Sequence, residues 1–191
     1  MGRATDRFTA LLGLWAVLAC LIELAALGVQ LSKHRTVLLY NMWWPFEFCA
    51  LVALAFLLAP ARAVRAVLLV GAFSALWCWN MMSIDPAAQL ADLSVIVGAL
   101  LLAGVYLHGL WMQADGHSTT FWQRPATWLS LAVLVYYGAS APLLGSINYF
   151  VQVDMPLARF LYNFTEVLFI TKFVLMGVAL LKARNATAHA R

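Results

Sequence analysis

Two residues capable of chemistry interrupt the apolar segment NMWWPFEFCALV, which spans residues 41–52. Glu47 carries an ionisable carboxyl group, and Cys49, two positions later, carries a thiol. Glu166 is a second acid in equally apolar surroundings. A charged side chain near the centre of a bilayer costs about 3 kcal/mol even on lenient insertion scales, so such a residue is by default a functional candidate whose partner has to be found. We take Glu47, Glu166 and Cys49 as the candidate catalytic residues.

The elements that must position these residues are transmembrane helices. Hydrophobic residues make up 64% of the 191 positions and charged residues 10%, a balance too apolar for the surface of a soluble protein. Six apolar runs reach the length of about 20 residues that crosses a bilayer, and they lie near 8–31, 37–59, 64–83, 88–112, 127–150 and 160–181. The connections are too short for a soluble domain. We therefore predict an all-α, six-helix transmembrane bundle that forms a single domain over residues 1–191.

The basic residues predict the orientation of the bundle, because Lys and Arg stay on the cytoplasmic side during insertion. One end of the predicted bundle collects eight of them, which are Arg3, Arg7, Arg62, Arg65, Arg124, Lys182, Arg184 and Arg191. The other end has three, which are Lys33, Arg35 and Arg159. Both termini are therefore expected in the cytoplasm. Topology and contact with anionic lipid account for the net charge of +4, so nucleic acid is not an expected partner.

Polar side chains gather in the half of the predicted bundle that lies away from the termini. They are Glu23, Asn41, Glu47, Asn80, Asp92, Asn148, Asn163 and Glu166. Aromatic residues occur at similar heights, and residues three or four apart share a helix face, so polar and aromatic groups form common stripes, such as Trp44 with Glu47 and Trp77 with Asn80. Stripes of this kind turned inward would line an apolar-walled pocket open to the outer leaflet. The expected substrate-binding residues are Trp44, Trp77, Asn80, Asp92, Asn148, Tyr149 and Asn163.

A purely structural role is the alternative for each of these groups, because polar side chains also fix helix packing by hydrogen bonding to one another. We favour that role for the asparagines, and leave it open for Glu23, which lies in a stripe of small residues. Lys172 is the only basic residue well inside a helix, and its depth matches both Glu47 and Glu166. Six positions separate it from Glu166 on their shared helix, which places those two on different faces. A buried Lys–Glu pair would be largely structural. An unpaired buried carboxyl group favours its neutral form, which is a proton donor.

Turn residues mark two of the expected helices. Asp85 is placed to cap the fourth helix, with Pro86 in its first turn. Gly138, Pro142 and Gly145 are small or bent positions at which the fifth helix can break beside a cavity.

Several kinds of site find no ligands in this sequence. It has no H-x-x-x-H pair and no C-x-x-C pair, and His108 is the only histidine within an expected helix. We therefore expect no metal and no cofactor. The three cysteines give no disulfide framework.

Three segments occur in the order found in a known family. They are WPFEFCALVALAFLL at 44–58, VLLVGAFSALWCWNM at 67–81 and GSINYFVQVDMP at 145–156. In these segments the chain resembles the YwaF-like bacterial integral membrane proteins, which are related to eukaryotic cysteine-dependent membrane phospholipid acyltransferases. The resemblance implies a bacterial inner-membrane protein with Cys49 as nucleophile, Pro45 as the motif proline, and Asn148 and Tyr149 at the rim of the site.

The chain departs from that family at the base that would activate the thiol. The family has a histidine in the following helices, and at the matching position this chain has Val97. His108 lies roughly 16 Å further along the same helix, too far to reach Cys49. A thiol without a base is a poor nucleophile.

We therefore predict a protein that binds, with or without modifying it, a lipid or isoprenoid-like molecule in an outer-leaflet pocket, with membrane lipids and a hydrophobic small molecule as its partners. Three alternatives stay open. The first is a terpenoid-cyclase-like enzyme that uses a neutral glutamate as its acid among aromatic faces. The second is the Cys49 acyltransferase. The third is a non-catalytic subunit of a membrane complex, with a membrane-protein partner or a second copy of the chain.

Overall fold

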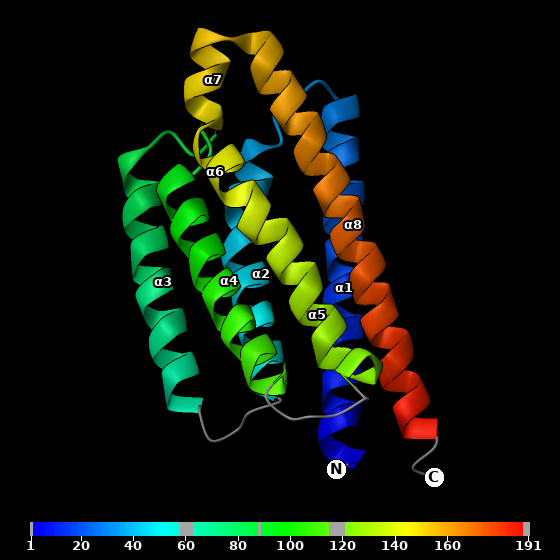
Figure 1. The fold of residues 1–191 in the computed structure, drawn as a ribbon. Helices are drawn as coiled ribbons and strands as arrows, with labels where there is room; N and C mark the ends of the chain where they lie inside the picture. The colour runs from blue at the N-terminus through cyan, green and yellow to red at the C-terminus, as the bar shows by residue number, and fades with distance from the viewer. Residues whose placement is uncertain (1, 58–62, 88, 115–120, 189–191) are drawn as a thin grey trace.

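The computed structural model describes residues 2–57, 63–87, 89–114 and 121–188. Its long helices run roughly side by side, with both termini at one end and α7 at the other (Figure 1). The elements are α1 (Gly2–Leu31), α2 (Val37–Leu57), α3 (Ala63–Ser83), α4 (Asp92–Ala114), the short 3-10 helix η2 (Phe121–Gln123), α5 (Pro125–Val133), the π-helical turn η3 (Leu134–Gly138), α6 (Ala139–Gly145), α7 (Ile147–Val153) and α8 (Met155–Ala188). No strand occurs in the described ranges.

Six helical stretches in this part of the chain are long and apolar enough to cross a membrane, which confirms the predicted fold class. They are Arg7–Leu31, Val37–Leu57, Val64–Ser83, Asp92–Gln113, Pro125–Leu144 and Met155–Asn185. The protein therefore has the architecture of a multi-pass membrane protein. Which end of the bundle faces the cytoplasm stays a prediction from the basic residues.

The helix ends near the polar half are fixed by local hydrogen bonds. After α1, the amide of Lys33 donates to the Gln30 carbonyl at 2.9 Å and that of His34 donates to the Val29 carbonyl at 3.1 Å. These two hydrogen bonds end the helix, and the Lys33 backbone lies in the left-handed region, at a φ of 60°. At the start of α8, the Asp154 carboxylate accepts the amide of Leu157 at 3.0 Å.

The fourth span starts later than the sequence predicted, so the expected cap role of Asp85 is wrong. The Asp85 carboxylate accepts the amide of Ala87 at 3.1 Å within a turn, and α4 begins only at Asp92. The Asn41 side chain explains the delay. Its amide donates to the Pro86 and Gln89 carbonyls at 3.0 and 2.9 Å, and its carbonyl accepts the amide of Ala91 at 3.0 Å. These backbone groups are therefore held by α2 instead of by a helix of their own.

The fifth span is also interrupted, although the sequence predicted one helix over 127–150. It passes from α5 through the π-helical turn into α6, and α6 ends at Gly145. Pro142 lies inside α6 and has no amide hydrogen to donate. The chain turns at Ser146 and continues as the separate helix α7. The expected break beside a cavity therefore exists, and it divides the predicted helix in two.

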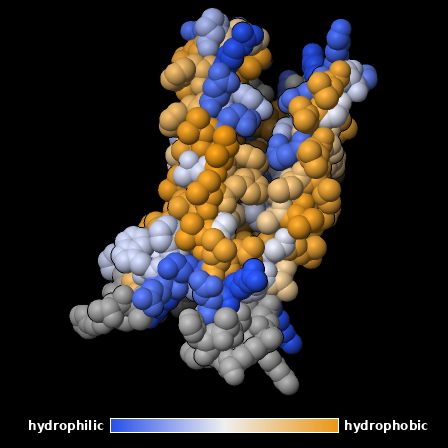
Figure 2. Space-filling model, turned by 90° about the vertical axis from the view of Figure 1, so that its right-hand side faces the viewer, coloured by the Kyte–Doolittle hydropathy of each residue, from blue (hydrophilic) through white to orange (hydrophobic). Residues whose placement is uncertain are grey.

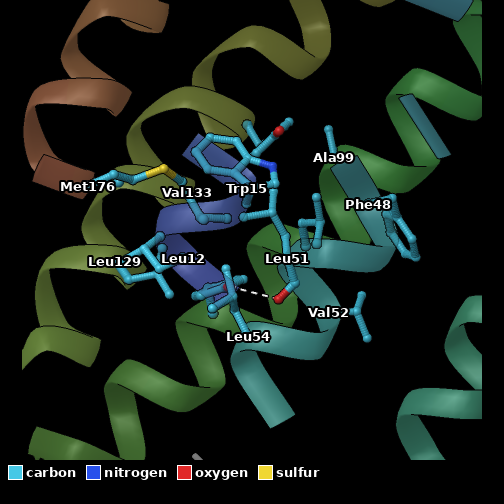
Figure 3. Packing of buried hydrophobic residues seen from close by; sticks show 14 of the residues in the cluster. Leu12, Trp15, Phe48, Leu51, Val52, Leu54, Ala99, Leu129, Val133 and Met176 are labelled. Carbon is cyan, nitrogen blue, oxygen red and sulfur yellow. Dashed lines mark hydrogen bonds between the residues drawn. The ribbon is translucent and has the colours of Figure 1, made fainter. Parts of the chain in front are cut away.

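The half of the bundle near the termini is filled by a hydrophobic core. Leu12 and Trp15 of α1 point toward Leu129 of α5 and Met176 of α8, and all four are buried (Figure 3). The Trp15 ring also stacks on Phe173 of α8, with 5.5 Å between the ring centroids. These contacts hold α1 and α8 together in this half.

Close packing of α2, α3 and α4 depends on one glycine. A Cβ atom at Gly98 would lie 2.6 Å from a ring carbon of Phe73 and 2.9 Å from one of Trp44. Real Cβ atoms do not approach other atoms so closely, so a larger residue would force the rings apart. This contact fixes the Trp44 ring, whose indole nitrogen also donates to the Ser94 carbonyl at 3.2 Å.

Candidate functional site

A cavity of about 480 Å³ occupies the half of the bundle away from the termini. On the side of the molecule where α1 and α8 lie, the surface is hollowed toward this end, between two apolar ridges with hydrophilic rims (Figure 2). The cavity lining comes from α1, α2, α4, the π-helical turn, α6, α7, α8 and two connections, and it mixes apolar side chains with acids, hydroxyls and aromatic rings. The lining residues are Glu23, Arg35, Thr36, Val37, Tyr40, Trp43, Trp44, Glu47, Leu90, Val95, Ala99, Tyr136, Tyr137, Ser140, Leu144, Ile147, Val151, Tyr162, Thr165, Glu166 and Phe169.

A buried ion pair lies at the inner wall of this cavity. The ammonium group of Lys172 donates to a Glu47 carboxylate oxygen at 2.9 Å. The Lys172 side chain is fully buried, whereas the Glu47 side chain is 9% exposed and lines the cavity. The sequence left two partners for Lys172, and the structure selects Glu47. The pair is neutral overall, which is the usual condition for keeping charges inside a bundle.

Five aromatic rings enclose the other sides of the Lys172 ammonium group. Its nitrogen lies 4.2 Å from the ring centroid of Tyr136 and 4.6 Å from that of Phe169. The rings of Trp15, Tyr137 and Phe173 complete the enclosure at 5.3 to 5.5 Å. The negative ring faces stabilise the cation by as much as about 2 kcal/mol when water is excluded. Lys172 is therefore held by both a carboxylate and an aromatic cage.

Two hydroxyl groups in the lining are buried without a hydrogen-bond partner among the described residues. They belong to Tyr137 and Ser140, which are each 1% exposed and lie three positions apart on neighbouring turns. An unsatisfied buried hydroxyl costs about 1–3 kcal/mol. Two of them lining one cavity indicate a place where a polar ligand group can bind.

Two more carboxylates line the cavity from the helices that flank its hollow side. Glu23 of α1 is half-buried and accepts the Tyr40 hydroxyl at 3.1 Å. Glu166 of α8 is exposed and lies beside the Tyr162 hydroxyl, one helical turn away. Both carboxylates therefore line one cavity, from two different helices. Arg35, in the connection between α1 and α2, is the only arginine in the described lining.

Three of the residues predicted for the site line the cavity, namely Glu47, Glu166 and Trp44. Trp77 and Asn80 lie outside the described lining, and both side chains form hydrogen bonds with neighbouring backbone groups. The Trp77 indole donates to the backbone carbonyl of Asn41 at 3.0 Å, and the Asn80 side-chain oxygen accepts the amide of Ser94 at 3.0 Å. The Asn80 side chain thus fixes helix packing, the role favoured for the asparagines from the sequence.

The other predicted binding residues are placed differently. Asp92 begins α4 and is not part of the described lining, and neither are Tyr149 and Asn163, whose side chains are exposed. The side chain of Asn148 lies outside the described residues. Cys49 is partly buried and also absent from the described lining. Its position two residues after Glu47 turns it to a different side of α2.

Sequence reasoning missed the π-helical turn and the residues around it. Tyr136 and Tyr137 are consecutive and both line the cavity, and Ser140 follows one turn later. The break signalled by Gly138 and Pro142 was the available hint, because π-helical turns often accompany functional sites. Within the described part of the chain, no group of three or more His, Cys, Asp or Glu side chains is arranged to hold a metal ion.

Comparison of the chain with protein-family models, with curated proteins and with solved structures finds no match. The likeness to YwaF-like proteins therefore stays a prediction that rests on three short segments. The geometry of the cavity is the basis for a functional assignment.

Proposed function

We propose that this membrane protein binds a lipid or isoprenoid-like molecule in the cavity between α1, α2, α8 and the α5–α6 span. The observation that carries the proposal is the cavity itself. Its volume of about 480 Å³ lies in the usual range for small-molecule sites, and its walls combine apolar side chains with a few polar groups. Glu47 and Glu166 are proposed as polar anchors, with Trp44 as part of the wall.

The surroundings of the cavity favour an amphiphilic ligand over a water-soluble one. Large apolar side chains are exposed on the two helices that flank the hollow side, with Leu24 of α1 at 65%, Phe160 of α8 at 66% and Val167 of α8 at 59%. In a bilayer these surfaces contact acyl chains. A ligand can therefore keep its tail among them while its polar end enters the cavity.

Mass spectrometry of lipids retained after purification in mild detergent tests the proposal. Leu144→Trp enlarges a lining residue and is expected to reduce the retained ligand several-fold. Leu100→Trp is the matched control, because Leu100 is 58% exposed on α4 and outside the described lining. Equal ligand content in the two variants would contradict binding in this cavity. A ligand-free protein that purifies with one stoichiometric protein partner would support the subunit alternative.

An acid-catalysed reaction is the second candidate function, and the position of Glu166 favours it. Glu166 lines the cavity beside Tyr162 and near Phe169, and aromatic faces stabilise developing cations. Glu47 is already engaged by Lys172, so the acid would be Glu166 rather than Glu47. On this proposal, Glu166→Gln abolishes conversion of the retained ligand while Cys49→Ala preserves it. The reverse result would support acyl transfer by Cys49.

A further inference from the structure

We propose that the cavity selects amphiphiles with a cationic amine head group. This inference rests on the proposed function, because it names the chemical class of the ligand in the same cavity. It depends on three separate features of the lining: its net charge, the two acids on its flanking helices, and its unpartnered hydroxyls.

The charged groups of the cavity leave an excess of negative charge. Three carboxylates line it, from Glu23, Glu47 and Glu166, and the described cations are Arg35 in the lining and Lys172 behind the inner wall. The formal balance is one net negative charge. Because Lys172 is committed to Glu47 at 2.9 Å, the lining acids that have no lysine or arginine bonded to them among the described residues are Glu23 and Glu166. An anionic head group would be repelled here, whereas a cation would be attracted.

Glu23 and Glu166 line the same cavity from two different helices, α1 and α8, and both carboxylates are hydrogen-bond acceptors. Like charges that share a partly apolar site repel one another. A cation between them reverses the sign of the interaction. An ammonium group has three N–H donors and no acceptor, which suits two carboxylates that accept only.

The buried hydroxyls supply further acceptors in the same cavity. Tyr137 and Ser140 have no partner among the described residues, and each hydroxyl oxygen has lone pairs that can accept an N–H bond. The aromatic lining adds ring faces from Tyr40 and Trp43, which attract cations. A hydrocarbon tail would lie along the exposed apolar side chains of the flanking helices, such as Leu24 of α1 and Val167 of α8.

Three amphiphiles with the same tail separate head-group charge from hydrophobic binding. Dodecylamine, dodecanol and dodecanoate are titrated into the purified protein in uncharged dodecyl maltoside micelles, and binding is followed by tryptophan fluorescence, since Trp43 and Trp44 line the cavity. We expect dodecylamine to bind at least about tenfold more tightly than dodecanol, because charge-assisted hydrogen bonds are the stronger kind. Dodecanoate is expected to bind most weakly.

Variants test whether the acids produce this preference. Glu23→Gln and Glu166→Gln are each expected to reduce the preference for dodecylamine over dodecanol about tenfold. Asp85→Asn removes the same charge at the same end of the bundle, outside the described lining, and is expected to leave the preference unchanged. Arg35→Gln removes a cation from the lining and is expected to increase the preference. Arg35→Gln is expected to raise the preference for dodecylamine, whereas a loss of folding would lower binding, so misfolding cannot produce the same result.

The outcomes distinguish this inference from the proposed function. Equal binding of the three amphiphiles, abolished for all by Leu144→Trp, would overturn the amine preference and leave lipid binding in the cavity intact. A preference for dodecanoate would also overturn it. Absence of binding by all three, together with no effect of Leu144→Trp on retained lipid, would overturn both.

Discussion

Removal of Lys172 tests whether the buried ion pair stabilises the bundle as its geometry indicates. Lys172→Met keeps an unbranched side chain of similar length but leaves the Glu47 carboxylate without its partner. For unit charges 2.9 Å apart, Coulomb's law at an effective dielectric constant of about 20 gives roughly 6 kcal/mol. Part of this Coulomb energy offsets the free-energy cost of removing the two ions from water. Loss of one member of a buried pair accordingly costs about 3–5 kcal/mol, and we expect that loss in the free energy of unfolding.

A double-mutant cycle isolates the contribution of the pair from other effects. Glu47→Gln alone leaves a buried ammonium group inside five aromatic rings and is expected to cost a similar amount. The double variant Glu47→Gln with Lys172→Met leaves no uncompensated charge. We therefore expect it to be more stable than the sum of the single losses predicts, with a coupling energy of at least about 2 kcal/mol.

The assay is unfolding in mixed micelles of dodecyl maltoside and dodecyl sulfate, followed by tryptophan fluorescence and extrapolated to zero dodecyl sulfate. Lys182→Met is the matched control, because Lys182 lies on the same helix near its exposed end, and it is expected to change the stability by less than about 0.5 kcal/mol. Additive single losses, with a coupling energy below about 0.5 kcal/mol, would refute the ion pair. A stability change in Lys172→Met no larger than that in the control would refute it as well.

The remaining predictions concern packing and helix ends. Gly98→Ala is expected to lower the free energy of unfolding by about 1–3 kcal/mol because the new methyl group enters the space of two rings. Gly104→Ala, on the same helix with nothing within 4 Å, is expected to raise it by about 0.5–1 kcal/mol, and equal effects would contradict the close approach at Gly98. Asn41→Ala removes three hydrogen bonds to the α3–α4 connection and is expected to cost about 2–3 kcal/mol and to speed its proteolysis. Asn163→Ala, at an exposed position, is expected to change neither measurement. Lys33→Gly is expected to stabilise the protein by about 1 kcal/mol, because glycine adopts a φ of 60° without strain, and a lower melting temperature would contradict this reason.

The six spans could be predicted from the sequence because length and apolarity alone determine which helices cross a bilayer. The late start of α4 could not. The groups that would form its first turns are held by Asn41, which precedes them in the chain by 45 to 50 positions. A local pattern such as Asp85–Pro86 correctly identifies a turn. It contains no information about a side chain, far away in the sequence, that forms hydrogen bonds with the same backbone groups. Such long-range hydrogen bonds override helix-start signals.

Part of the site was also accessible from the sequence. Helical periodicity placed Trp44 and Glu47 on a face that does line the cavity. The same reasoning placed Trp77 and Asn80 toward the bundle, but it could not show that hydrogen bonds to neighbouring backbone occupy them. The partner of Lys172 was undecided because Glu47 and Glu166 lie at similar depths on different helices. Depth is a one-dimensional quantity, whereas ion pairing depends on how the helices pack.

The π-helical turn explains why the tyrosines were harder to identify. Tyr136 and Tyr137 both line the cavity, as do consecutive residues of regular helix such as Trp43 and Trp44. The two tyrosines lie, however, in the wider turn Leu134–Gly138, where the angle between successive residues differs from the regular value of about 100°. A face extrapolated from α5 at regular helical spacing is therefore out of register at these tyrosines.

The burial of the three acids follows the compensation that each of them has. Glu47 is buried and has a full counter-charge at 2.9 Å, so it can be placed at the inner wall of the cavity. Glu23 accepts the Tyr40 hydroxyl at 3.1 Å and is half-buried, and Glu166 lies beside the Tyr162 hydroxyl and is exposed. The acid with a full counter-charge is thus the most deeply buried of the three, as desolvation energy requires. The acids nearest to solvent and lipid are consequently the ones with charge left to offer a ligand, whereas the charged side chains that are buried in the described part of the chain, Glu47 and Lys172, form a neutral pair.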